Sequence, residues 1–405
     1  LGPQNDMATI RLLYKTVRRL GWSRGCGTAA AVLYGLSVIG LSTFVMIRMY
    51  MLLTLLAVVL MYLIVCLMQE FKPKYCILTG LVLLAGLITQ YYFVFYAFFL
   101  CAGYVIYALV KREYKALAWF VPCALVGALS LLLVFPACID HLFADNIVSG
   151  GNAMENLRNF AQYPVRLRTF ISFITHGLKA AIIIALLAII ALGVYFRKFK
   201  AAVKDKRLDL RALVLIVPAF VVLVIVALIS PVDEPRYIYN LVPAFVLAAC
   251  LLLYLLEESL GSFEREGLIK TAALLCIMAL ALWQARCAPP DYLYPEYAEY
   301  DAIVAEHSDD KCVYFSDNRF EAITQDLLQL MAFDDFYVSD DTELTGALDY
   351  VGGADEFVAY VDISEFWSSG YDPDKIISAL ADASDYDKAE LLYQNGLSAT
   401  YLISK

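Results

Sequence analysis

Three short polar stretches lie at the ends of long apolar runs, and their side chains suit the binding of a phosphate group. They read Arg48-Met49-Tyr50, Thr89-Gln90-Tyr91-Tyr92 and Pro235-Arg236-Tyr237. A guanidinium group binds phosphate oxygens through parallel N–H bonds, and tyrosine adds a hydroxyl donor on an amphipathic ring. The residues that we expect to bind such a group are Arg48, Tyr50, Gln90, Tyr91, Arg236 and Tyr237.

Each of these residues also has an ordinary explanation. Tyrosine is enriched at membrane surfaces, and an arginine at the end of an apolar helix extends toward the headgroups. A single residue therefore fits an anchoring role as well as a binding role. A site is favoured only if the stretches meet on one side of a membrane, which depends on the helices that carry them.

The chain is apolar enough to be an integral membrane protein over much of its length. Hydrophobic residues make up 61% of its 405 residues. A helix of about 20 apolar residues crosses the hydrocarbon core of a bilayer. The sequence predicts about nine such helices, over residues 26–46, 50–68, 75–90, 92–110, 116–135, 170–196, 212–230, 238–255 and 268–286.

The basic residues between these helices predict their orientation. Nineteen Lys and Arg residues lie in residues 1–25 and in every second connection after them, whereas five lie in the other connections. Cytoplasmic connections carry the excess of basic residues. We therefore expect a cytoplasmic N-terminus, and we expect Arg48, Gln90 and Arg236 on the outer side.

Charge further divides the chain into domains. We expect residues 1–25 to form a basic cytoplasmic segment and residues 26–287 a polytopic transmembrane domain. Residues 1–287 hold 26 Lys and Arg against 14 Asp and Glu, whereas residues 288–405 hold 5 against 26. Nucleic-acid binding needs basic surface to replace counterions, so the acidic part excludes it. We expect residues 288–405 to form an acidic extracytoplasmic domain.

The acidic part alternates between stretches rich in Val, Tyr and Phe and helical stretches, which is typical of a small α/β domain. We expect strands at 312–315, 336–338, 357–361 and 400–403, and helices at 321–332 and 374–383. Its acidic pairs lack calcium-loop spacing, and the ten cysteines lack metal-ligand spacing. The predicted fold class is a mainly α polytopic membrane protein followed by this domain. No metal site or cofactor is implied.

Together, in their order and sidedness, the three stretches resemble the multi-spanning GT-C glycosyltransferases. The pattern is an apolar run ending in Arg48-Met49-Tyr50, the turn Thr89-Gln90-Tyr91-Tyr92, and Pro235-Arg236-Tyr237 leading into Leu241-Val242-Pro243. Similar families are the bacterial protein O-mannosyltransferases and the aminoarabinose transferase that acts on lipid A. The resemblance covers about residues 10–260.

This resemblance implies the transfer of a sugar from a polyprenyl-phosphate donor to a lipid or glycan acceptor. The reaction would take place on the outer side of a bacterial plasma membrane. By the same resemblance, Arg48 and Arg236 hold the donor phosphate, while Tyr50, Tyr91 and Tyr237 shape the pocket.

Two features depart from the family pattern. Gln90 stands where relatives often have a histidine, and its amide cannot titrate. The family's catalytic acid lies in a long outer loop between its first two spans, whereas here the first outer connection is the short one at Arg48. We therefore expect this chain to lack the first two spans and that loop. The alternative is that Asp233 or Glu234 deprotonates the acceptor hydroxyl.

Two other functions remain open on the sequence alone. The chain could be a non-catalytic lipid-binding or scaffold protein whose outer domain recognises a partner. It could also transport lipid-linked saccharides, although no apolar stretch carries the central acidic residue or arginine that marks an ion path. Turnover of a lipid-linked sugar would separate an enzyme from a binding protein.

Overall fold

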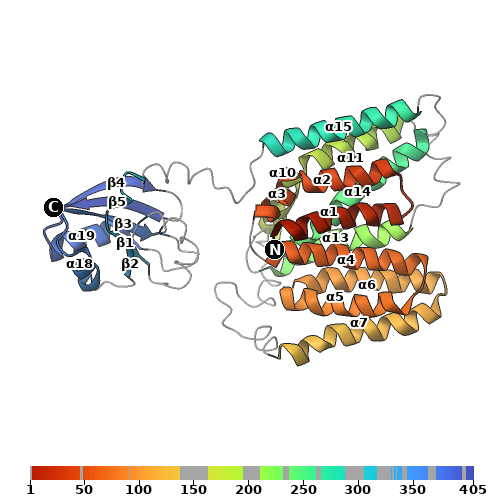
Figure 1. Cartoon of the computed structure of the whole chain (residues 1–405), viewed down its shortest axis with the longest axis horizontal. Helices are drawn as coiled ribbons and strands as arrows, with labels where there is room; N and C mark the ends of the chain where they lie inside the picture. Colours follow the sequence, from red (N-terminus) through yellow and green to blue (C-terminus); the bar gives the residue numbers. More distant parts are fainter. Residues whose placement is uncertain are drawn as a thin grey trace. The chain divides into compact units, whose positions relative to one another are not determined.

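The structure is a computed structural model of the whole chain, and it divides into two compact units, Leu1–Leu293 and Tyr294–Lys405. The first unit is helical and the second contains a β-sheet (Figure 1). The structure describes residues 2–45, 49–90, 92–136, 163–194, 210–230, 237–260, 266–287, 305–316, 330, 333, 335–339, 344–363, 371–394 and 398–405.

The helical unit is a bundle whose helices run mostly along one direction. Its elements are α1 (Gly2–Arg19), α2 (Arg24–Gly35), α3 (Val38–Val45), α4 (Met49–Gln69), α5 (Pro73–Thr89), α6 (Phe93–Val110), α7 (Tyr114–Val134), α10 (Tyr163–Gly177), α11 (Lys179–Val194), α13 (Leu210–Ile229), the 3₁₀ turn η2 (Tyr239–Leu241), α14 (Val242–Leu260) and α15 (Glu266–Cys287).

Helix α4 lies inside this unit. Its residues Leu53, Ala57, Leu60 and Ile64 are fully buried, and it packs against α1, α5 and α6. The α4 sequence is apolar around most of its circumference, as expected for a helix surrounded by other helices. By contrast, α7 exposes Leu125, Val126 and Leu129, as expected for a helix that faces lipid.

Helix α1 is amphipathic and belongs to the bundle. Leu13 and Val17 are fully buried, whereas Arg11, Lys15 and Arg18 lie one helical turn apart on an exposed face. The buried stripe packs against α2 and α4. The charged residues interrupt the apolar run, so the sequence predicts no span here although the segment forms a full-length helix.

The direction of α1 differs from the predicted topology. The Gln69 side chain at the end of α4 donates a hydrogen bond to the carbonyl of Arg19 at the end of α1. The two helices are therefore parallel, and Figure 1 shows α1 starting at the end of the unit where α4 also starts. The charge distribution predicts that residues 1–25 all lie at the end of the unit that carries the basic connections. In the structure, only the last part of α1 and the start of α2 lie at that end.

Five helices of the described part are long and apolar enough to span a membrane, or six if a bent pair counts as one span. They are α4, α6, α7, α13 and the segment Tyr239–Ser259. α5 is apolar but shorter. The chain is therefore a multi-pass membrane protein, and the predicted fold class is confirmed.

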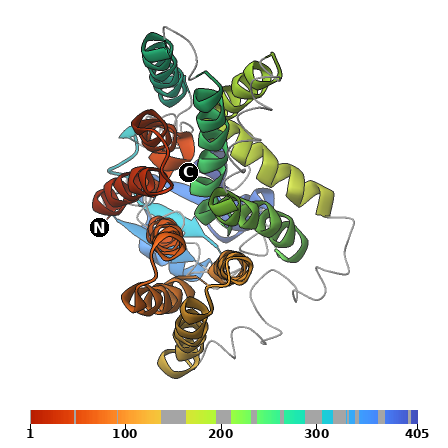
Figure 2. The same ribbon diagram turned by 90° about the vertical axis from the view of Figure 1, so that its right-hand side faces the viewer.

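Two of the predicted spans are broken in the structure. Residues 26–46 divide into α2 and α3 because the Ser37 hydroxyl accepts a hydrogen bond from the Gly40 N–H and so starts a new helix. Residues 170–196 bend by 86° between α10 and α11. In Figure 2, where most helices are seen end-on, α10 lies lengthwise across the unit.

The bend between α10 and α11, here called the elbow, is stabilised by one side chain of α15. Gln284 donates a hydrogen bond to the Gly177 carbonyl (2.8 Å) and accepts one from the Ala180 N–H (2.6 Å). Only 2% of Gln284 is exposed. A broken helix in lipid needs such partners because no water reaches its free backbone groups.

The second unit is a five-stranded sheet in the order β2-β1-β3-β5-β4. Strands β1, β2 and β3 are parallel, whereas β5 is antiparallel to β3 and β4 is antiparallel to β5. One face packs on two helices that hold Ala347, Val351, Ile376 and Leu380 against it. The elements are β1 (Cys312–Phe315), β2 (Phe336–Ser339), α18 (Thr345–Val351), β3 (Glu356–Asp362), α19 (Pro373–Ala383), β4 (Lys388–Gln394) and β5 (Ser398–Ser404).

The sequence predicts most of this unit correctly. The four expected strands are β1, β2, β3 and β5, and the expected helix at 374–383 is α19, in which Asp372 caps the first turn. It misses β4, a polar and largely exposed strand, and the short helix α18. The helix expected at 321–332 falls almost wholly outside the described residues.

Candidate functional site

Five aromatic side chains gather at the end of the helical unit where α4 starts. The ring centroids of Tyr50 and Tyr239 are 5.7 Å apart, and those of Phe173 and Tyr239 are 5.3 Å apart. Tyr92 and Tyr237 form a closer pair, with centroids 4.4 Å apart. We call these five residues the aromatic cluster.

The topology of the bundle explains why residues so far apart in sequence meet here. Tyr50 lies in the first turn of α4, Tyr92 directly precedes α6, and Tyr239 opens the turn that leads into α14. Helices α6 and α14 start at the same end of the unit as α4 because each follows a long helix, α5 or α13, that runs in the opposite direction. Phe173 comes from α10, which lies across this end (Figure 2).

Buried polar side chains accompany the aromatic rings. Ser230, at the end of α13, is fully buried, and Asn240 in η2 is 2% exposed. The Oε1 atom of Gln90, at the end of α5, is buried and has no hydrogen-bond partner within the described part of the chain. A buried carbonyl oxygen without a partner is costly unless a ligand or water supplies a donor.

Arg166 on α10 brings a positive charge to this site. It is only 3% exposed, whereas Arg168, two residues further along α10, is exposed. Burial and then the neighbouring Tyr237 raise the pKa of the Tyr92 phenol above its ordinary value, while a hydrogen bond with Ser230 and the charge of Arg166 act in the opposite direction. Tyr92 therefore stays a neutral hydrogen-bond donor beside a buried guanidinium group.

The structure places three of the six predicted binding residues at this end of the unit. Tyr50 and Tyr237 belong to the aromatic cluster, and Gln90 precedes Tyr92 by two residues. Arg48, Tyr91 and Arg236 lie outside the described residues. The proposed bases Asp233 and Glu234 lie outside them as well.

Sequence reasoning missed Arg166 and Phe173. It counted Arg166 only as one of the few basic residues on the outer side, and it placed Phe173 inside a predicted span. The elbow turns α10 across the end of the unit and thereby directs both side chains to the site. An arginine next to a connection that is poor in basic residues is the signal that could have singled out Arg166.

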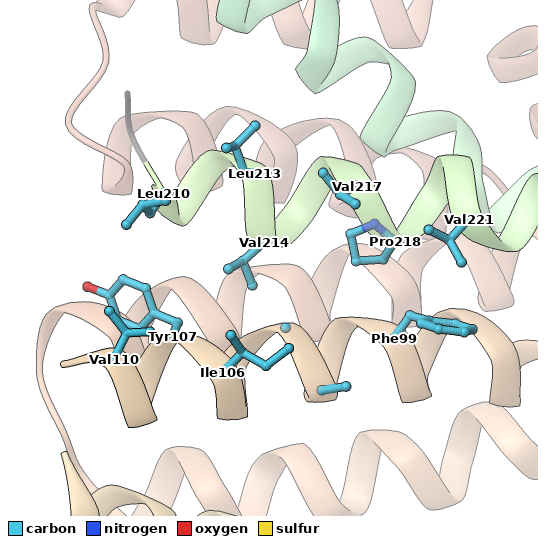
Figure 3. A pocket seen from close by; sticks show the side chains of 12 residues that line it. Phe99, Ile106, Tyr107, Val110, Leu210, Leu213, Val214, Val217, Pro218 and Val221 are labelled. Carbon is cyan, nitrogen blue, oxygen red and sulfur yellow. The ribbon is translucent and has the colours of Figure 1, made fainter. Parts of the chain in front are cut away.

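Two of the apolar cavities between the described helices concern the site. One has a volume of about 330 Å³ and runs between α6 and α13 from Phe99 and Val221 to Val110 and Leu210 (Figure 3). The other has a volume of about 360 Å³ and lies beneath the elbow, lined by Ile174 of α10 and by residues of α11, α13 and α14. The elbow cavity and the aromatic cluster share helix α10, because Ile174 lines the cavity and directly follows Phe173.

Within the ranges that the structure describes, no group of three or more His, Cys, Asp and Glu side chains could hold a metal ion. The described part of the site instead offers an arginine, phenols, amides and a serine hydroxyl. These groups suit an anionic or hydroxyl-rich ligand.

Comparison with solved structures identifies the architecture. The chain resembles ArnT from Cupriavidus metallidurans, solved bound to undecaprenyl phosphate, with a TM-score of 0.52 and 12% identity over 98% of this chain and 82% of that one. ArnT is a GT-C glycosyltransferase. The chain has the GT-C fold. The resemblance predicted from the three stretches is therefore confirmed at the level of the fold.

A second solved structure aligns with more of this chain, but the alignment spans a smaller share of the other protein. The arabinofuranosyltransferase AftD from Mycobacteria aligns with a TM-score of 0.47 and 16% identity, over 99% of this chain and 33% of AftD. No protein-family model matches the chain. No curated protein matches its sequence either.

Proposed function

We propose that this protein is a membrane glycosyltransferase that moves a sugar from a polyprenyl-phosphate donor to a lipid or glycan acceptor. The observation that carries the proposal is the buried Arg166 beside the aromatic cluster at one end of a GT-C fold. A guanidinium group at this place can bind the oxygens of a lipid phosphate through parallel N–H bonds.

The two predicted phosphate-binding arginines support the same location. Arg236 is bonded to Tyr237, and Arg48 precedes Tyr50 by two residues. Consecutive Cα atoms are about 3.8 Å apart, so the Cα atom of each arginine is within about 8 Å of the Cα atom of a tyrosine of the aromatic cluster. We propose that Arg48, Arg166 and Arg236 share the donor phosphate, with Tyr50, Gln90, Tyr91 and Tyr237 around it.

The elbow cavity suits the isoprenoid part of the donor. It is apolar, it has a volume of about 360 Å³, and it opens beneath the helix that carries Arg166. ArnT, which has the same fold, was solved bound to undecaprenyl phosphate. We propose that this cavity takes the first isoprene units while the phosphate lies at the aromatic cluster.

The chemistry follows from the charges in this arrangement. Departure of the lipid phosphate develops negative charge on the leaving oxygen, and fixed arginines stabilise that charge in the transition state. The acceptor hydroxyl must lose its proton to a base, for which Asp233 and Glu234 are the candidates in this chain. We propose that the reaction takes place on the extracytoplasmic side, with the acidic C-terminal domain on that side too.

The decisive experiment compares Arg166→Ala with Arg168→Ala. Both substitutions remove one arginine from α10, but only Arg166 is buried at the site. In proteoliposomes with a radiolabelled polyprenyl-phosphate sugar, we expect Arg166→Ala to lower transfer by about 100-fold or more. Arg168→Ala should keep transfer within about threefold of the wild type.

The outcomes separate the candidate functions. Equal transfer by the two variants would refute the role of Arg166. Donor binding without any turnover by the wild-type protein would favour the lipid-binding or scaffold interpretation. If the double variant Asp233→Asn, Glu234→Gln keeps full activity, neither residue is the base.

A further inference from the structure

Three cations and one carboxylate meet at the opposite end of the helical unit, at a corner formed by α1, α4 and α5. Arg19 ends α1, while Lys72 and Lys74 lie at the start of α5. Glu70 pairs with Lys72, with 2.7 Å between Oε2 and Nζ. These four described side chains together carry an excess of two positive charges, from Arg19 and Lys74.

The guanidinium group of Arg19 has fixed neighbours but does not use all of its hydrogen-bond donors within the described part of the chain. Its side chain lies beside the Cys66 thiol and the Tyr62 phenol of α4. Its Nε atom is buried and has no hydrogen-bond partner among the residues that the structure describes. Lys74 lies near the same thiol, and its Nζ is 5.2 Å from the centre of the Tyr75 ring. Two neighbouring cations with an available N–H donor suit the binding of an anionic group.

An exposed apolar surface continues from this corner into the membrane. Lys74, Ile77 and Leu81 recur along one face of α5, and the two apolar side chains are 51% and 57% exposed. Ile77 and Leu81 also line an apolar groove of about 320 Å³ between α5 and α7. The helices touch there through Gly80 and Gly127, and this close contact brings the walls of the groove together.

We propose that this corner is a binding site for an anionic phospholipid of the membrane. The phosphate group would lie between Arg19 and Lys74, within reach of the Tyr62 and Tyr75 hydroxyls. One acyl chain would lie along Ile77 and Leu81 in the groove between α5 and α7. Basic pockets between membrane helices on the cytoplasmic side bind anionic headgroups in this way.

The combination of charge and apolar groove distinguishes a lipid from a free anion. Inorganic phosphate would use only Arg19 and Lys74, whereas a phospholipid also covers the exposed face of α5. The site is separate from the proposed donor site, because α4 and α5 each extend from one end of the unit to the other. Tyr50 and Gln90 lie at the aromatic end, and Gln69 and Lys72 lie at this end.

The test measures phospholipid retention on the full chain in nanodiscs containing phosphatidylglycerol and phosphatidylcholine. Native mass spectrometry reports which lipids stay bound after the disc is removed. We expect retained phosphatidylglycerol, and about 30-fold weaker binding for the double variant Arg19→Gln, Lys74→Gln, because each basic residue contributes about fivefold. The control Lys111→Gln, Lys115→Gln removes the same charge from another connection at this end and should change little.

A second variant covers the case in which Arg19 is needed for folding. Lys74→Gln combined with Ile77→Trp changes only exposed side chains, removing one charge and filling the mouth of the groove. It should also lose phosphatidylglycerol. The proposal would be overturned if the wild type retained phosphatidylcholine as well as phosphatidylglycerol. It would also be overturned if both variants retained phosphatidylglycerol as the wild type does. Displacement of the lipid by millimolar inorganic phosphate would show a free-anion site instead and overturn it too.

Discussion

Replacing Gln284 by methionine removes both hydrogen bonds of the elbow while nearly preserving side-chain volume. The Gly177 carbonyl and the Ala180 N–H then lose the partner that now lies 2.8 Å and 2.6 Å away. A buried backbone group without a partner costs about 1–3 kcal/mol. For two such groups we expect Gln284→Met to lower the free energy of unfolding by about 2–6 kcal/mol.

The assay is reversible unfolding in mixed micelles with increasing dodecyl sulfate, followed by far-ultraviolet circular dichroism. Gln69→Met is the matched control, because Gln69 is exposed and its side chain makes a single hydrogen bond to the Arg19 carbonyl. That variant should lose about 1 kcal/mol or less. The free energy of unfolding of Gln284→Glu should fall as the pH rises, because only the protonated side chain can donate to the Gly177 carbonyl and an unpaired buried carboxylate is costly.

A specific result would refute this reasoning. If the free energy of unfolding of Gln284→Met is within about 0.5 kcal/mol of the wild-type value, helix packing rather than Gln284 stabilises the elbow. If Gln69→Met costs as much as Gln284→Met, the loss reflects any Gln-to-Met change and not the broken helix. Because α10 carries Arg166 and Phe173, loss of the elbow should also weaken donor binding in the same variant.

Three further predictions concern packing, ionisation and capping. A Cβ at Gly127 would lie 2.2 Å from the carbonyl oxygen of Gly80, so Gly127→Ala should force α5 and α7 apart and cost about 1–3 kcal/mol in the same unfolding assay. Because burial raises the pKa of Tyr92, its contribution to stability is complete below about pH 10 and declines as the pH rises above that value, and Tyr92→Phe should reduce this alkaline decline. The Asp372 side chain accepts from the Asp374 N–H (3.2 Å) at the start of α19, so Asp372→Ala should cost about 1 kcal/mol and speed hydrogen exchange in α19 about fivefold.

The sequence predicted the candidate site in part. Short connections place Tyr50, Gln90 and Tyr237 on one side of the membrane, since helices that alternate in direction return to the same side at every second connection. This shared side depends only on the apolar length of the helices and the charge of their connections. It could not predict that Tyr239 would contact Tyr50 while Tyr237 paired with Tyr92, because ring contacts depend on how the helices are rotated and spaced.

The membrane class, most apolar helices, four strands and helix α19 follow from local properties of the chain: apolar length, alternation and capping residues. Tertiary structure decided the rest. Helix α1 belongs to the bundle because α2 and α4 cover its apolar stripe. The charged residues between the apolar ones make that stripe hard to recognise in the sequence. The elbow exists because Gln284, about one hundred residues away, satisfies the broken backbone. Arg166 reaches the aromatic cluster only because that distant side chain lets α10 turn across the end of the unit.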